Sequence, residues 1–155
     1  MPEYIIASSK TEYEAAANLF KEYANWLQVD LCFQSFEKEL QALPQMYSVN
    51  DGGIILCKDK NNYIGCVALR RIDDVTAELK RMWVQPPFQK KGIGEKLLYE
   101  AILMAKKLQY KLIRLDTVTK LVPAIALYKK NGFVETTAYY KNPLPDVVYM
   151  EKQLG

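Results

Sequence analysis

Histidine is absent from all 155 residues of the sequence. It is the commonest general base near neutral pH and the commonest zinc ligand. Its absence excludes Ser-His-Asp and Cys-His catalysis, and it leaves acid and base chemistry to Glu, Asp, Tyr, Lys, Cys or water. We therefore predict no metal site.

Cysteine is scarce, and the three that occur, Cys32, Cys57 and Cys66, form no CxxC pair. An odd number of separated cysteines favours reduced, buried thiols over a disulfide framework. The first residues, MPEYIIASSKTEYEAA, lack the basic segment and the apolar run of a signal peptide, and no later stretch is long enough to span a bilayer. We expect a soluble cytoplasmic protein with no membrane partner.

The excess of positive charge is small, since the net charge is +3 and 25% of the residues are charged. Any basic patch must therefore be local, which weighs against a dedicated nucleic-acid-binding protein. A hydrophobic fraction of 50% is enough for a real core. Because no repeat or linker interrupts the chain, we predict one domain over residues 1–155.

The first half of the chain has the pattern of a strand, two helices and a β-meander. A short strand at 4–7 precedes a helix that a capping box of Thr11 and Glu14 would open, and Ser35 can cap a second helix ending near Pro44. From Gly53, the runs GIILCK, YIGCVALRRI and VTAELKRMWV are rich in β-formers and separated by turn residues. These three runs predict antiparallel strands.

The second half predicts a helix from Ile93 to about Gln109, a strand at KLIRLDTV and a helix over about 124–131 that Gly132 ends. FVET and VVYMEKQL are the closing strands. A parallel crossover around the long helix is implied. The predicted fold class is α/β (α+β), with a mixed, mostly antiparallel central sheet flanked by helices.

An anion site is expected where VTAELKRMWV leads through QPPF into QKKGIG and a helix begins. N–H groups at a helix start point toward an anion, and Gly92 and Gly94 remove side chains that would block a phosphate. Lys90, Lys91 and Lys96 add positive charge. The spacing matches neither a P-loop nor a dinucleotide motif. A loop whose glycines serve only the backbone is the alternative.

QKKGIG, placed after a strand and at the head of an amphipathic helix, resembles the Q/R-x-x-G-x-G/A signature of the GNAT superfamily of acyl-CoA N-acyltransferases. ALYKKNGF resembles the second landmark of that family, and the order of elements resembles the whole GNAT domain. DLCFQSFEKELQALP and YYKNPLP are similar to segments of uncharacterised bacterial GNAT proteins. The chain departs from the family at Leu121, where many members have asparagine seven residues before the landmark tyrosine.

This resemblance implies acetyl-CoA as the cofactor. Backbone amides from 89 to 96 would bind the pyrophosphate, and Met82 and Val84 would hydrogen-bond the pantetheine arm through their main chain. The family also implies a bulge in this strand and a separation from its neighbour that admits the cofactor. The cofactor residues expected are Met82, Trp83, Val84, Gln89, Lys90, Lys91, Gly92, Ile93, Gly94, Glu95 and Lys96.

Two catalytic residues follow from the same resemblance. Tyr128, the tyrosine of the second landmark, would protonate or hydrogen-bond the departing sulfur, and a phenol is protonated at neutral pH. Glu78 would be the base, directly or through water. The alternatives for Glu78 are a solvated strand carboxylate and an ion-pair partner of Lys80. The N–H near Met82 would polarise the acetyl carbonyl.

The acceptor site is expected between the loop after the first helix and the late loop. In it Asp30 would hold a cationic amine and Arg71 an acceptor carboxylate. The full set of candidates is Asp30, Gln34, Arg71, Tyr139, Tyr140 and Asn142.

The predicted function is transfer of an acetyl group from acetyl-CoA to a primary amine of a small molecule or peptide, by direct attack in a ternary complex. A non-catalytic acyl-CoA sensor and a nucleic-acid-binding lysine cluster are the competing interpretations. A homodimer through the late strands is a further expectation.

Overall fold

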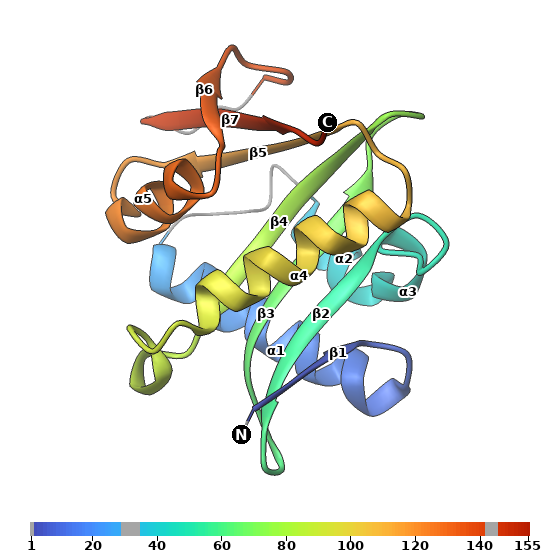
Figure 1. The fold of residues 1–155 in the computed structure, drawn as a ribbon. Coiled ribbons are helices and arrows are strands. Elements are labelled where there is room, and N and C mark those ends of the chain that lie inside the picture. Colours follow the sequence, from blue (N-terminus) through green and yellow to red (C-terminus); the bar gives the residue numbers. More distant parts are fainter. Residues whose placement is uncertain (1, 29–34, 142–145) are drawn as a thin grey trace.

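The computed structural model describes residues 2–28, 35–141 and 146–155, and a seven-stranded sheet in the order β1-β2-β3-β4-β5-β7-β6 runs through its centre (Figure 1). The elements along the chain are β1 (Glu3–Ile6), α1 (Lys10–Leu27), α2 (Phe36–Gln41), α3 (Leu43–Met46), β2 (Gly53–Asp59), β3 (Asn62–Arg71), β4 (Thr76–Val84), the 3₁₀ turn η2 (Pro86–Phe88), α4 (Ile93–Lys107), β5 (Leu112–Val118), α5 (Val122–Lys130), β6 (Val134–Thr136) and β7 (Val147–Gln153).

The sheet has the mixed topology that the sequence predicts. Neighbouring strands pair antiparallel everywhere except at β4 and β5, which run parallel and are connected through α4. A parallel pair needs such a crossover because its two strands start at the same edge. The predicted α/β fold class and the crossover are both confirmed.

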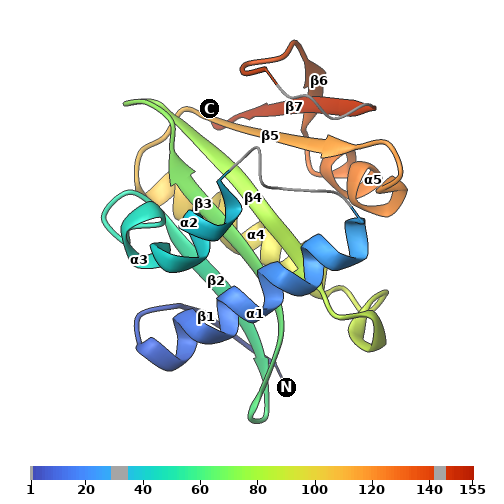
Figure 2. The ribbon, with the colours of Figure 1, turned by 180° about the vertical axis from the view of Figure 1, so that it is seen from behind.

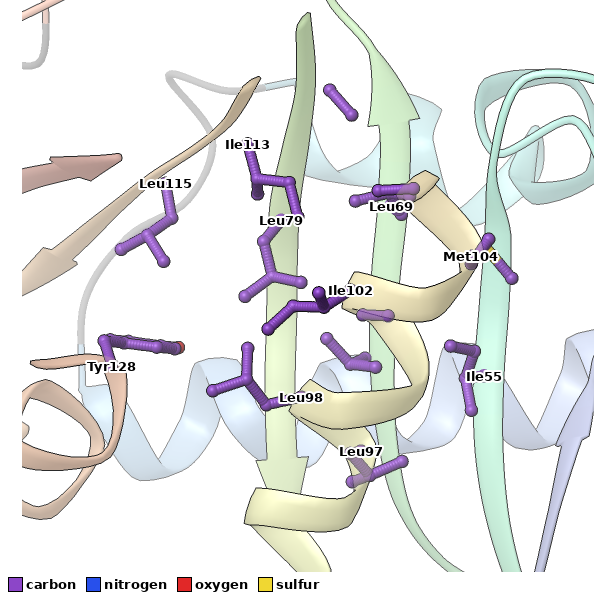
Figure 3. Close-up of a cluster of buried hydrophobic side chains, with 14 of the residues drawn as sticks. Ile55, Leu69, Leu79, Leu97, Leu98, Ile102, Met104, Ile113, Leu115 and Tyr128 are labelled. Carbon is purple, nitrogen blue, oxygen red and sulfur yellow. The ribbon is translucent and has the colours of Figure 1, made fainter. Parts of the chain in front are cut away.

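Helices cover both faces of the sheet. In Figure 1, α4 lies in front of β2, β3 and β4, whereas Figure 2 shows α1, α2 and α3 on the opposite face. Each face therefore has its own apolar cluster. The cluster under α4, shown in Figure 3, includes Ile55, Leu69, Leu79, Leu97, Leu98, Ile102, Ile113, Leu115 and Tyr128.

Two predicted caps in the first half differ from the structure, although Ser35 is the N-cap residue of α2 as expected. The capping box of α1 is formed by Ser9 and Glu12 rather than by Thr11 and Glu14, so the helix begins earlier. Ser35 has φ 57° and makes no side-chain cap to α2. A serine can accept from the N2 or N3 amide only from an extended backbone, and this left-handed conformation removes that geometry.

Pro44 does not end the second helix as predicted. The break falls at Ala42, and Pro44 lies in the first turn of a separate short helix, α3. Proline is tolerated there because the first amides of a helix have no intrahelical partner. Pro44 is therefore compatible with the start of a helix as well as with its end.

A bulge and a strand separation shape the centre of the sheet. In the β3–β4 ladder Ala68 faces Lys80 and Cys66 faces Trp83, so two residues of β4, Arg81 and Met82, lie opposite one residue of β3. Arg81 has φ 59°. The pairing of β4 with β5 ends just before the bulge, since it covers only the three positions from Thr76 to Glu78 within the described residues. The expected bulge and separation are both present.

Candidate active site

The predicted anion cradle lies at the start of α4. Gly92 is the N-cap residue, has φ 84° and makes no side-chain cap with the described residues. The first helical bond runs from the Lys96 amide to the Gly92 carbonyl at 3.1 Å. The amides of Ile93, Gly94 and Glu95 therefore precede any intrahelical partner and form the donor set of a helix N-terminus.

The two glycines leave open space in front of these amides. No atom of the described residues would come within 4 Å of a Cβ at Gly92, and a Cβ at Gly94 would meet only Leu127, at 3.7 Å. The positive φ explains glycine at 92, but packing inside the protein does not explain it at 94. A ligand that approaches the backbone closely would explain glycine at position 94. The cradle therefore fits a pyrophosphate.

Some predicted donors of the cradle are engaged inside the protein. The Gln89 amide donates to Pro86 O at 3.2 Å, and Gln89 Nε2 donates to Val84 O at 2.8 Å. The Lys96 ammonium pairs with Glu100 at 3.1 Å and turns away from the helix start. This leaves the amides of residues 90–95 as the candidate donors of the cradle.

Neighbouring side chains brace that segment. The ammonium of Lys91 lies 5.7 Å from the Phe88 ring centroid. The Glu95 carboxylate pairs with Lys130 of α5 at 3.1 Å, which ties the start of α4 to α5. A carboxylate held there is directed away from an incoming phosphate, because it already has a cation.

Tyr128 lies where β4 and β5 have separated. It is 6% exposed, and its ring centroid is 5.7 Å from that of Phe133. Figure 3 shows the ring extending from α5 toward the gap between the two strands, next to Leu98 and Leu115. Burial, followed by nearby Tyr23 and Asp116, raises the pKa of Tyr128 well above 10, so the phenol keeps its proton.

Glu78 is buried on the opposite face, with 2% exposed. Its Oε1 accepts from Arg70 Nε at 2.7 Å, and its Oε2 accepts from the Tyr139 hydroxyl at 2.7 Å. The Lys80 ammonium lies 3.8 Å from Oε1. The carboxylate is thus a buried ion-pair partner rather than a solvated group, and both oxygens are engaged.

Three tyrosines of the late segment form a cluster beside Glu78. The ring centroids of Tyr139, Tyr140 and Tyr149 lie 5.3–5.9 Å apart. The Tyr140 hydroxyl donates to Asp116 Oδ2 at 2.5 Å. Burial and the Glu78 charge raise the pKa of Tyr139 well above 10. Asp116 thus connects this cluster with Tyr128, whose pKa it also raises.

The structure separates Arg71 from the other acceptor candidates. Arg71 pairs with Asp51 and Asp74, each at 3.2 Å, and lies over the Tyr110 ring. Successive strand residues point to opposite faces, so its neighbour Arg70 points toward Glu78 and Tyr139 instead. The remaining candidates Asp30, Gln34 and Asn142 lie outside the described residues.

Trp83 faces α1 rather than the cofactor cradle. Its ring lies 5.5 Å from Trp26, and its Nε1 donates to Glu22 at 3.2 Å. Lys120, in the loop before α5, lies over Trp26 at 5.6 Å and donates to the Leu27 carbonyl. These contacts attach the end of α1 to β4 and to the loop before α5, on both sides of the strand separation.

Sequence reasoning missed a buried ion pair at the bulge. Arg81 Nη2 and Nε donate to Glu39 of α2 at 2.8 and 3.1 Å, and the Tyr47 hydroxyl donates to Glu39 Oε2 at 2.9 Å. Burial opposes ionisation of Glu39, but the hydrogen bond and charge of Arg81 lower its pKa below the ordinary value. The three charged residues of helix α2, Glu37, Lys38 and Glu39, resemble a solvated face in sequence, which hid this contact.

Comparison with known proteins identifies the family. The model of the acetyltransferase (GNAT) family matches residues 15–133. An uncharacterised N-acetyltransferase of Schizosaccharomyces pombe is 36% identical over 139 residues, which cover 88% of this chain and 85% of that protein. An uncharacterised N-acetyltransferase of Dictyostelium discoideum is 29% identical, over 88% of this chain and 92% of that protein. The chain belongs to the GNAT family of acetyltransferases, and the predicted acyl-CoA-dependent N-acetyltransferase is confirmed at this level.

Solved structures agree in fold. A GNAT acetyltransferase from Staphylococcus aureus superposes with a TM-score of 0.84 at 22% identity, covering 100% of both chains. An acetyltransferase from Salmonella typhimurium, solved with its cofactor acetyl-CoA, superposes with a TM-score of 0.78 at 19% identity, covering 100% of this chain and 95% of that one.

The described residues form neither a metal-ligand cluster nor a membrane-spanning helix. They contain no group of three or more Cys, Asp or Glu side chains arranged to hold a metal ion. None of the helices in the described ranges is both long and apolar enough to cross a bilayer.

Proposed function

We propose that this GNAT enzyme transfers the acetyl group of acetyl-CoA to a primary amine of a small molecule or peptide, with both substrates bound together. The observation that carries the proposal is the combination of an open cradle at Gly92 and Gly94 with a buried, protonated Tyr128 at the strand separation. The cradle would hold the pyrophosphate, and the tyrosine lies deeper in the same gap.

When bound, acetyl-CoA supplies an activated acetyl thioester. The amides of Ile93, Gly94 and Glu95 would bind its pyrophosphate, together with the charge of Lys90 and Lys91. The main chain of β4 after the bulge, at Met82 and Val84, would bind the pantetheine arm. On the edge of β4 that faces away from β3, the pairing with β5 ends at Glu78 within the described residues, which leaves main-chain groups beyond it for a ligand.

The reaction moves two protons, one to the departing sulfur and one from the attacking amine, and a residue is assigned to each. The Tyr128 hydroxyl would donate to the departing sulfur. For the amine proton, we assign Glu78 acting through Tyr139, because the Tyr139 hydroxyl already donates to Glu78 and its oxygen can accept from an amine. Much of the rate enhancement would come from holding amine and thioester together.

The first experiment is thermal unfolding with and without acetyl-CoA, with ADP as a control for phosphate binding alone. Ligand at 100 times its dissociation constant adds about 2.7 kcal/mol of stability, which raises the midpoint by about 5–10 °C. A clear shift with acetyl-CoA and a small one with ADP is expected. No shift at saturating acetyl-CoA would overturn the proposed cofactor.

A Tyr128→Phe variant tests whether Tyr128 is a catalytic acid or whether the protein is a non-catalytic acyl-CoA sensor. We expect kcat for amine-dependent CoA release to fall about 10²-fold, with little change in KM for acetyl-CoA, because only the proton donor is lost. Tyr63→Phe, at the far end of β3, is the matched control. Wild-type protein that binds acetyl-CoA but releases no CoA with any amine would favour the sensor.

We also propose a cytoplasmic location and a homodimer. Cys57 and Cys66 are free thiols, which persist in a reducing compartment. For the dimer, β6 forms one edge of the sheet and exposes Val134 to 61%, and an edge strand has unpaired backbone groups that a second copy can meet. Light scattering on the eluted protein distinguishes a mass of two chains from one.

A further inference from the structure

A row of charged side chains crosses four strands on the face opposite α4. Arg70, Glu78, Arg114 and Glu151 are register partners in turn on β3, β4, β5 and β7. Arg70 Nε lies 2.7 Å from Glu78, and Arg114 Nε lies 3.5 Å from Glu151. Since the charges alternate in sign along the row, the row is neutral by itself.

Lys80 adds a positive charge that this row does not balance. It lies two residues beyond Glu78 on β4, on the same face, and its side chain is only 9% exposed. Its ammonium is 3.8 Å from Glu78 Oε1, an oxygen that Arg70 already occupies. The next cation, Arg81, is paired with Glu39 at 2.8 Å. Among the described residues, Lys80 makes no hydrogen bond.

A second unused donor faces the same area. Arg114 Nε is buried and donates no hydrogen bond within the described residues. The Arg114 guanidinium lies 5.5 Å from the ring centroid of Tyr139, the residue that donates to Glu78. The Arg114 side chain as a whole is 33% exposed and pairs with Glu151, but a buried donor atom without a hydrogen bond is unfavourable, and an atom of a bound ligand would satisfy it.

Lys80 and Arg114 lie on the two strands that border the strand separation, β4 and β5. Asp116, two residues beyond Arg114 on β5, raises the pKa of Tyr128, so the acidic side of this surface is near the proposed acid. Lys80 is on the other bordering strand, β4. An acceptor that extends from Tyr128 across the separated strands would therefore present its amine near Asp116 and its far end near Lys80.

We propose that the acceptor is an amine that also carries a carboxylate, and that the Lys80 ammonium binds this carboxylate with help from Arg114. The inference rests on the proposed function and specifies its acceptor class. Lys80 is a specificity residue here and takes no part in the chemical step. A free amino acid or the end of a short peptide meets this description.

Other acceptor classes fit the charges less well. A diamine would bring a second positive charge toward Lys80, Arg70 and Arg81, and like charges at this range repel. A neutral amide would leave the Lys80 ammonium with only the Glu78 oxygen that it shares with Arg70. Burial, followed by the charge of Arg81, lowers the pKa of Lys80, and a bound carboxylate would counter both effects.

The test compares matched amines with wild-type protein and variants. The substrates are ω-amino acids of increasing chain length, two dipeptides, their primary amides and the corresponding diamines, with CoA release as the readout. Lys80→Met removes the charge and keeps the apolar stem, Lys80→Arg keeps the charge, and Lys58→Met on β2 is the control lysine. Acetyl-CoA binding is measured for each variant by thermal shift.

We expect wild-type kcat/KM to be at least about tenfold higher for the best acid than for its amide, the effect of one charge-assisted hydrogen bond. Lys80→Met should lower kcat/KM for the acid to the level of its amide, mainly through KM for the acid, while the shift with acetyl-CoA is retained. Lys80→Arg should retain part of it, and Lys58→Met all of it.

Two results would overturn the inference while leaving the proposed function intact. One is acetylation of amides or diamines as efficiently as of the acids. The other is an equal loss of activity on acid and amide in Lys80→Met. Acetyl-CoA binding without acetylation of any carboxylate-bearing amine would also count against it. Loss of the acetyl-CoA shift in wild-type protein would instead contradict the proposed function itself.

Discussion

Among single residues, the Glu39–Arg81 pair shows how a buried charge holds the site in place. Arg81 occupies the bulge of β4 with φ 59°, an uncommon conformation for a side chain of this size. Its guanidinium reaches α2 and is 8% exposed, while Glu39 is 3% exposed. The pair therefore anchors the strand at the point where β4 leaves β5.

Removing one partner of this pair should be costly. Glu39→Gln removes the carboxylate charge that faces the buried Arg81 guanidinium, and breaking a buried pair destabilises by about 3–5 kcal/mol. Tyr47→Phe removes one hydroxyl from the same network and should cost only about 1 kcal/mol. Urea unfolding at pH 7 measures both. Equal, small losses in the two variants would show that the pair contributes little.

In the ion pair between Glu78 and Arg70, the sequence pointed to the carboxylate but not to its arginine partner. Glu78 was expected at the site because it lies on the strand that leads to the cradle, whereas Arg70 was passed over for Arg71. A shift of one residue exchanges the two faces of a strand. Only the register with β4 decides which arginine faces the carboxylate.

At the scale of elements, the start of α4 is the part that sequence predicts best. A strand, a glycine-rich turn and an amphipathic helix follow one another directly, so local chain geometry alone builds the cradle. Its start at Ile93 agrees with the prediction, and its last residue, Lys107, lies two residues before the predicted end. The amides exposed there follow from helix geometry without tertiary contacts.

Gly94→Ala should separate stability from binding within this element. Packing leaves room for the methyl group, and alanine in a helix is favoured over glycine by up to about 1 kcal/mol. We expect the unliganded protein to be as stable as wild type or slightly more so in urea. The same methyl group would intrude on the bound pyrophosphate, so the acetyl-CoA thermal shift should shrink.

Calorimetric titration of this variant with acetyl-CoA gives the change in affinity. Gly132→Ala is an unsuitable control because its φ of 93° and the close Lys152 would strain the fold. Ala101→Gly in the middle of α4 is better, since it changes the same residue types in the opposite sense away from the cradle. Unchanged affinity in Gly94→Ala would argue that the cradle does not hold the cofactor.

At the scale of the whole molecule, buried tyrosine hydroxyls should make the free energy of unfolding depend on alkaline pH. Burial raises the pKa of Tyr47 and Tyr128 well above 10, and burial with the Glu78 charge does so for Tyr139. In the unfolded chain these phenols titrate near 10. Below pH 10 both states keep the protons, so these groups add no pH dependence.

Above pH 10 the unfolded chain loses protons that the folded chain retains, so stability should fall. Each such tyrosine contributes up to about 1.4 kcal/mol per pH unit. Urea unfolding from pH 8 to pH 11 measures the slope, and Tyr128→Phe should reduce it by the share of one phenol. A wild-type stability that stays level to pH 11 would contradict the burial of these hydroxyls in solution.

The sequence by itself determined the class of fold, the order of the elements and the glycine-rich turn at the head of α4, and its resemblance to the GNAT family supplied the candidate acid Tyr128. These are set by local periodicity, turn residues and short motifs, which act over a few neighbouring positions. The tertiary structure decided which charged residues meet. Glu39 and Arg81 are 42 positions apart, and Tyr139 and Glu78 are 61 apart. Such contacts depend on strand register and helix packing, and no local pattern encodes them.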